Sequence, residues 1–353
     1  MSLDEPLPPA NPLSPPDKDA ALSPLIPPAA VSPPADAEDC ITAELVPAAA
    51  ETPRVWTALV VGILAIPLAA VVSGAILVAA MLAVHGPAMF RDGGSAASAP
   101  TEETEFTETP VFDGSALEGW LEGFAQTRLG LVVLVVPGQL VFLLIAVGAA
   151  SLSPQGLATR LSLRWGGLPR WTWLVLMLGT PIIGVLSSHM LSLLTDDLSD
   201  QLKLVESMMR THVRDFPVGL IAIVAILPGV VEELLFRGYL QSRLLLRWPP
   251  ALAVGVSALV FSAAHMDPLH VLGVLPLGLW LGAVAWRAGS VWPAVLCHAV
   301  NNAVAVAGSA YQDTSTLELT LDPFSVTLLA VGGPAFLASL AILRFRPAGE
   351  PQG

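Results

Sequence analysis

Three short polar groups interrupt otherwise apolar sequence between residues 232 and 302, and they hold the side chains that could do chemistry. The groups are Glu232, Glu233 and Arg237 in GVVEELLFRGYL, Phe261 and His265 in LVFSAAHMDPLH, and His298, Asn301 and Asn302 in VWPAVLCHAVNNAVAV. A charged side chain at the centre of a bilayer is unfavourable by about 2.5 to 3.5 kcal/mol, so charges inside apolar segments need a functional or a structural reason.

The spacing of the first group separates its two acids. Glu233 and Arg237 are four residues apart with the acid first, which is the favourable order for an ion pair on a helix. Glu232 is rotated from Glu233 by about 100° and stays available for another partner. One acid is therefore predicted to be structural and the other free for chemistry. The alternative is an ion cluster that only pins the helix or reaches the membrane surface.

Depth places the glutamates near the first histidine. Glu232 precedes the turn at Pro249 and Pro250 by 17 residues, and His265 follows that turn by 15. In an antiparallel pair of helices the two side chains lie at similar depth. His298 and Asn302, four residues apart, share one face of a later helix. We therefore predict a site built by three helices.

Two kinds of hydrolytic chemistry fit these residue types. A carboxylate in apolar surroundings is a useful general base for water, His265 could orient that water, and His298 with Asn302 could donate to an oxyanion. Alternatively His265 and His298 bind a divalent metal such as zinc, with Glu232 as third ligand or as base. The single-helix zinc signature HExxH is absent, which favours the metal-free version without excluding the other.

The composition indicates which elements must position these residues. The chain is 54% hydrophobic and 13% charged, which is typical of a membrane protein. Most of its apolar stretches reach the roughly 20 residues that a spanning helix needs. We predict an all-α polytopic helical bundle of about eight transmembrane helices, with the fifth the weakest because Pro268 follows it. The stretches are 55–85, 129–151, 171–194, 217–240, 251–266, 269–286, 290–309 and 324–343.

Charge is distributed unevenly along the chain. The net charge is -13, and 22 of the 29 acidic residues lie in 1–53, 86–128 and 196–216. Basic residues are scattered singly, which argues against a nucleic-acid partner. With eight alternating helices one end collects the basic residues and is predicted to be cytoplasmic, together with both termini. These residues are Arg54, Arg160, Arg164, Arg170, Arg243, Arg247, Arg287, Arg344 and Arg346.

The three polar groups, taken in order, are similar to the motifs of the CPBP family, which includes the type II CAAX prenyl endopeptidases (Rce1-like) and bacterial Abi proteins. The resemblance covers about residues 215–310. It implies an intramembrane endopeptidase, glutamate-type or metal-dependent, acting on a membrane-anchored and in some members prenylated protein. The Ala- and Pro-rich tail indicates a bacterial source, so we predict a bacterial inner membrane location. The roles implied are water activation by Glu232, water binding by His265, oxyanion stabilisation by His298 and Asn302, and support by Glu233 and Arg237.

The domain organisation follows from these assignments. We predict a disordered, acidic, Pro-rich tail at 1–53, which holds 13 of the 32 prolines. Accessory helices with an acidic loop at 86–128 occupy 54–214, the catalytic region is 215–310, and 311–353 is a last helix with a short cytoplasmic tail. The first two spans are interpreted as variable decoration. Two other functions stay open: a non-catalytic binding, immunity or secretion-associated factor, and a proton-coupled transporter with Glu232 and His265 as relay.

Overall fold

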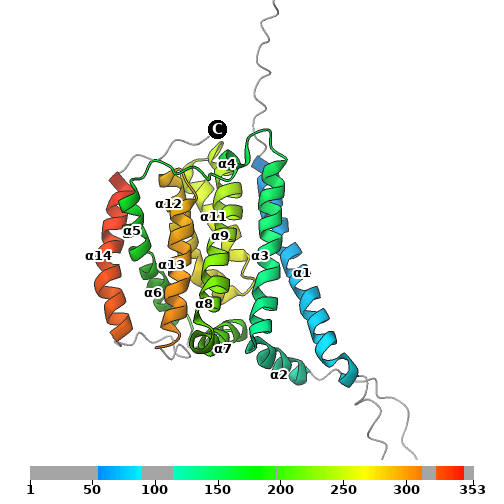
Figure 1. The fold of residues 1–353 in the computed structure, drawn as a ribbon. Helices are drawn as coiled ribbons and strands as arrows, with labels where there is room; N and C mark the ends of the chain where they lie inside the picture. Colours follow the sequence, from blue (N-terminus) through cyan, green and yellow to red (C-terminus); the bar gives the residue numbers. More distant parts are fainter. Residues whose placement is uncertain (1–54, 90–113, 196, 312–322, 346–353) are drawn as a thin grey trace, which may run out of the picture. The chain divides into compact units, whose positions relative to one another are not determined.

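The protein is an all-α polytopic membrane protein, as predicted. A computed structural model describes residues 55–89, 114–195, 197–311 and 323–345, and every regular element in these ranges is a helix (Figure 1). The predicted tail at 1–53 and the acidic segment 90–113 lie outside the described residues. Within the described chain six helical segments are long and apolar enough to span a bilayer: Val55–Ala83, Arg128–Ser151, Arg170–Ser192, Pro217–Leu245, Pro268–Ala288 and Pro323–Phe345.

The first two spans, α1 (Val55–Met89) and α3 (Arg128–Ser151), pack against each other (Figure 1). Small buried residues on α1, Ala58, Ala65 and Ala69, let its neighbours approach closely, as is common in membrane bundles. The other side of α1 exposes large apolar side chains such as Leu64 and Val71. This distribution suits a helix with one face on protein and the other on lipid.

The central span, Pro217–Leu245, is a helix of mixed geometry. Two π-helical stretches flank the short helix that ends in both glutamates. A π-helix is rare and often marks a functional site. The span consists of α8 (Pro217–Leu220), η1 (Ile221–Ile226), α9 (Leu227–Glu233), η2 (Leu234–Gln241) and α10 (Ser242–Leu245).

The helix after the central span, α11 (Pro250–Ala263), has 14 residues. At 1.5 Å per residue it is about 21 Å long, which is short of the roughly 30 Å of hydrocarbon. The helix ends at Ala263, and Met266 in the following turn has a positive φ of 56°. Asp267 adopts extended dihedrals before Pro268, and its side chain caps the next helix by accepting from the His270 N–H at 2.8 Å. His265 therefore lies in a turn rather than on a helix.

The eight predicted apolar stretches are all helical, but two are shorter than a full span. These are α11 and α13 (Trp292–Gly308), which has 17 residues. The predicted third stretch is divided at Thr180 and Pro181. The remaining helices of these stretches are α5 (Arg170–Gly179), α6 (Pro181–Ser192), α12 (Pro268–Ala288) and α14 (Pro323–Phe345).

Two helices lie where the sequence predicted loops. They are α2 (Gly114–Ala125) and α7 (Asp200–Asp215), at the same end of the bundle (Figure 1). Ser199 caps α7 by accepting from the Leu202 N–H, and Gln126 Nε2 donates to Ser207 Oγ at 3.0 Å, joining the end of α2 to α7. A further short helix, α4 (Leu157–Arg160), lies at the opposite end (Figure 1).

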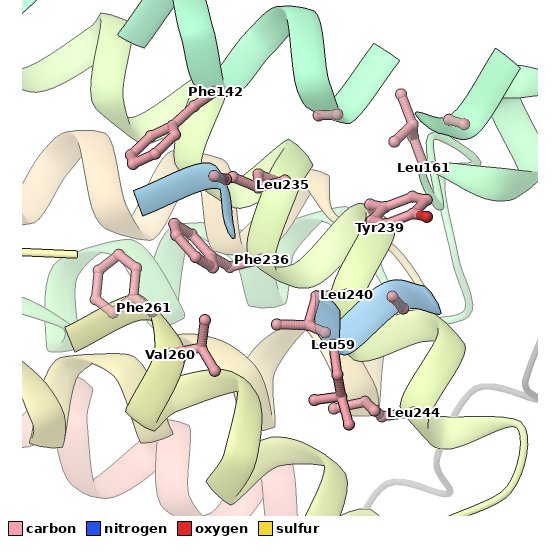
Figure 2. Close-up of a cluster of buried hydrophobic side chains, with 14 of the residues drawn as sticks. Leu59, Phe142, Leu161, Leu235, Phe236, Tyr239, Leu240, Leu244, Val260 and Phe261 are labelled. Atoms are coloured by element: carbon pink, nitrogen blue, oxygen red, sulfur yellow. The ribbon is translucent and has the colours of Figure 1, made fainter. Parts of the chain in front are cut away.

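The largest apolar core joins the first spans to the central ones. Figure 2 shows Phe142 of α3, Leu59 of α1, and Phe236 of η2 with Phe261 of α11 in this core. The Phe236 ring packs edge-on against Phe142 and Phe261, with centroid distances of 5.8 and 5.5 Å. The described residues from Val55 to Phe345 belong to one compact unit. The predicted accessory helices and the central helices therefore share a core, which fixes Phe261 in position.

Candidate active site

Glu233 has an arginine and a histidine as partners, both at Oε1, while its Oε2 is buried without a hydrogen-bond partner among the described residues. Its side chain is fully buried, and Oε1 accepts from Arg237 Nη1 at 2.7 Å and lies 2.9 Å from His298 Nδ1. Arg237 Nη2 donates to the Gly278 carbonyl of α12 at 2.8 Å, and the guanidinium lies over the Phe261 ring at 4.3 Å. The predicted ion pair is present, and it ties the central span to α11, α12 and α13.

Gly278 allows this close packing. A Cβ at this position would lie 3.1 Å from Cδ1 of Phe261. Any larger side chain would push either α12 or the Phe261 ring away, and the guanidinium of Arg237 would lose its carbonyl partner. The glycine therefore supports the buried ion pair from the neighbouring helix.

Glu232 has different surroundings. Its side chain is 11% exposed, whereas that of Glu233 is 0% exposed. Glu232 Oε1 accepts from Gln139 Nε2 of α3 at 2.7 Å. Its other oxygen, Oε2, lies 3.9 Å from His298 Nε2, which is too long for a hydrogen bond. One oxygen is thus held, and the other faces a histidine without bonding to it.

His298 lies between the two carboxylates. A carboxylate is an acceptor, so Nδ1 of His298 carries the proton in the 2.9 Å contact with Glu233. Nε2 then presents a lone pair toward Glu232 in the neutral ring and an N–H in the doubly protonated ring. Glu233 thereby fixes both the orientation of the imidazole and the nitrogen that faces Glu232.

His265 joins this group through an aromatic contact. The buried Phe261 ring meets His265 and His298 edge-on, with centroid distances of 5.6 and 5.7 Å. His265 is near enough to Glu232 and His298 to interact electrostatically with both. From α7, Gln201 Nε2 donates to the backbone carbonyl of His265 at 3.0 Å. The turn that carries His265 is thus contacted by Phe261 of α11 and by Gln201 of α7.

Asn302 contacts a different part of the central span. Its Nδ2 donates to the Val224 carbonyl of η1 at 3.2 Å, and its Oδ1 accepts from Asn301 at 3.3 Å. Asn302 thus joins α13 to the π-helical stretch η1 of the central span. The contacts described for it lead to Val224, whereas Glu232, Glu233, Arg237, His265 and His298 lie together.

Two residues near the site were missed from the sequence. Gln139 reaches Glu232 from α3, and its signal is an amide within the apolar segment VVPGQLVFLL. His270 follows Pro268 and has no polar partner four residues away, so helical spacing does not single it out. The turn nevertheless brings its ring to 4.3 Å from that of His265, and the Nδ1 atoms of both are buried without a partner in the described residues.

The metal site predicted from Glu232, His265 and His298 stays a prediction. Among the described residues no three His, Cys, Asp or Glu side chains are arranged to hold a metal ion. In the predicted set of Glu232, His265 and His298, the nearest atoms of Glu232 and His298 are 3.9 Å apart.

The fold and the site together define a polytopic membrane protein with a glutamate and a histidine facing each other inside the helical bundle. Residues 214–304 match the family described as type II CAAX prenyl endopeptidase Rce1-like. This match confirms the resemblance to the CPBP family over that segment, and it supports protease activity of the CAAX/CPBP type. No curated protein and no solved structure matched the chain.

Proposed function

We propose that this protein is an intramembrane endopeptidase in which Glu232 activates water to hydrolyse a peptide bond of a membrane-associated protein. The observation that carries the proposal is the 3.9 Å separation between Glu232 Oε2 and His298 Nε2. A water molecule at about 2.8 Å from each atom bridges such a pair. Glu232 Oε1 is occupied by Gln139, so Oε2 is the oxygen directed at that water.

The reaction uses the chain's own groups. Glu232 takes a proton as the water oxygen bonds to the amide carbon, which gives a tetrahedral oxyanion. The carbon–nitrogen bond then breaks, and the proton on Glu232 passes to the leaving nitrogen. The products are a carboxylate and a new amino terminus, so atoms and charges balance without a further reactant.

His298 is the proposed oxyanion donor. Its doubly protonated ring donates from Nδ1 to Glu233 and offers Nε2–H to the developing charge. Asn302 is the second proposed donor, since an asparagine amide has two N–H groups and one of them is used on Val224. His265, whose ring packs against Phe261, is the residue proposed to hold the water.

The substrate class follows from the position of the site. Glu232 lies near the middle of the 29-residue span Pro217–Leu245, so the scissile bond must reach the interior of the bundle. A membrane anchor on the substrate, such as a prenyl group on a CAAX-like protein, raises its concentration at this depth. We also assign the protein to a bacterial inner membrane with the arginine-rich end and both termini in the cytoplasm.

The test is cleavage of lipid-anchored peptides by the purified full-length protein in proteoliposomes. A farnesylated CAAX peptide and the same sequence with a myristoyl anchor are the two probes. Glu232→Gln keeps the shape and the acceptor for Gln139, and it should lower cleavage by roughly 10²- to 10⁴-fold. Glu206→Gln on α7 is the control and should cleave like the wild type. Equal cleavage by wild type and Glu232→Gln would overturn the proposal, and pH-dependent flux without cleavage would favour the transporter.

A further inference from the structure

A second polar cluster lies at one end of the bundle, away from the glutamates. Arg160 of α4 and Arg243 of α10 are 7% and 8% exposed, and they are close enough to repel each other electrostatically. Arg243 lies over the ring of buried Tyr239 at 5.2 Å. Burial and the neighbouring Arg243 both lower the pKa of Arg160. Two buried arginines therefore lie near enough to each other to interact.

No described acid balances this pair. Arg160 Nε donates to Ser153 Oγ, and Arg243 Nε is buried with no hydrogen-bond partner in the described residues. The ion pairs found in the described chain involve other residues. Burying a charge without an opposite charge is unfavourable. The arrangement is therefore complete only with an anion.

The fold holds the two arginines together through a close backbone approach. A Cβ on Gly238 would lie 2.8 Å from the carbonyl oxygen of Leu161, the residue after Arg160. Glycine lets η2 touch the chain after α4, which brings Tyr239 and Arg243 next to Arg160. The cluster is thus built by packing and does not depend on flexible surface side chains.

The position of the pair identifies the source of the anion. Arg160 follows the span Arg128–Ser151, and Arg243 lies in the last turns of Pro217–Leu245, so both are at the level where spanning helices leave the hydrocarbon. The described helix ends there carry arginines, whereas the described acids outside the glutamate site lie on or near α2, α7 and the start of α12. The arginines of this end are Arg160, Arg164, Arg170, Arg243, Arg247, Arg287 and Arg344.

We propose that Arg160 and Arg243, with the Tyr239 hydroxyl, bind the phosphate group of an anionic phospholipid. A guanidinium matches phosphate oxygens with paired N–H donors, and a basic pocket at the headgroup level is a recognised way to bind anionic lipid. The lipid places its phosphate between the two charges and its chains along the apolar helix surfaces. This site is independent of the proposed hydrolysis.

The test is thermal unfolding of the full-length protein in neutral detergent with short-chain phosphatidylglycerol, short-chain phosphatidylcholine or inorganic phosphate. At saturating concentration, phosphatidylglycerol should raise the unfolding temperature of the wild type by roughly 5 °C, and phosphatidylcholine should not. A rise with inorganic phosphate equal to that with phosphatidylglycerol would assign the site to free phosphate and overturn the lipid as its source.

Matched arginine variants locate the effect. Arg243→Gln should abolish the rise, while Arg247→Gln, which removes the same charge from an exposed position four residues away, should keep it. If Arg243→Gln does not fold, Arg160→Gln and Arg243→Lys carry the same comparison, with loss in the first and a reduced rise in the second. No rise in the wild type, or an equal rise in the Arg160 and Arg243 variants, would overturn the proposal.

Discussion

Glu232 and Glu233 are adjacent in the sequence and lie in opposite kinds of surroundings. Glu233 is buried against Arg237 and His298, whereas Glu232 is held by an uncharged amide and keeps some exposure. A rotation of about 100° on one helix separates the two. The comparison teaches that one acid stabilises the site and orients the histidine, while the other is left with an oxygen that can react.

The largest expected effect is on stability and concerns Glu233. Glu233→Gln leaves the Arg237 charge buried without its partner, which should lower the free energy of unfolding by roughly 3 to 5 kcal/mol. Glu232→Gln should change it by less than about 1 kcal/mol. Thermal unfolding in detergent measures both. Equal losses for the two variants would remove the distinction between a structural and a reactive acid.

The next largest effect is on cleavage and concerns Gln139, the hydrogen-bond partner of Glu232. Gln139→Ala removes the 2.7 Å bond to Glu232, and hydrogen bonds to charged groups contribute about 1.5 to 3 kcal/mol. Cleavage should fall by roughly 10- to 100-fold, mainly in kcat, and Gln139→Asn should recover little because its amide is one carbon shorter. Unchanged kcat in Gln139→Ala would show that α3 takes no part in positioning Glu232.

Variants of Asn302 test whether the site depends on η1, the π-helical stretch that precedes the glutamates. Asn302→Ala leaves the Val224 carbonyl without this donor and should destabilise the protein by about 1 kcal/mol. Asn301→Ala, the matched control, should have a smaller effect because the bond described for it goes only to Asn302. Loss of cleavage in Asn302→Ala with unchanged stability would assign the residue to the oxyanion alone.

The smallest effect concerns an exposed ion pair, which contrasts with the buried one. A hydrogen bond from Lys203 and its charge lower the pKa of Asp197. The stabilisation from this pair is present above the ordinary pKa of an aspartate and is lost as pH falls through the lowered value. Lys203→Met should return the pKa toward the ordinary range in an NMR titration, with almost no change in unfolding temperature. A large change in the unfolding temperature would contradict the solvent screening expected of this exposed pair.

Apolar stretches and local spacing were sufficient to predict the membrane helices and the ion pair. Four-residue spacing predicts the pair because it is a property of the helix itself. Glu233 with Arg237 followed from the sequence for that reason. Gln139 did not, since its bond to Glu232 joins residues 93 apart and depends on how α3 packs. His270 was missed because a turn, and not a helix face, sets its distance to His265.

Polar stretches and helix lengths were harder to predict. Helices α2 and α7 lie in segments whose acidic residues suggested loops. Two signals for α7 were present in the sequence: the cap at Ser199 and the amphipathic pattern of apolar and polar residues. Helix α11 ends at Ala263 after 14 residues, before Met266 with its positive φ, so Pro268 marked this end only approximately. The bond from Asn302 to the Val224 carbonyl could not be predicted, because it depends on how α13 packs against η1.

The π-helical stretch η2 lies between Glu233 and Arg243. A π turn takes up one more residue than an α turn, so η2 sets the angle at which the downstream arginine faces relative to the upstream acid. Deleting one residue between Arg237 and Arg243 would turn Arg243 by roughly 100° about the helix axis, away from Arg160, while leaving the Glu233–Arg237 pair in place. The winding of one helix thus connects the buried acids to the proposed lipid site.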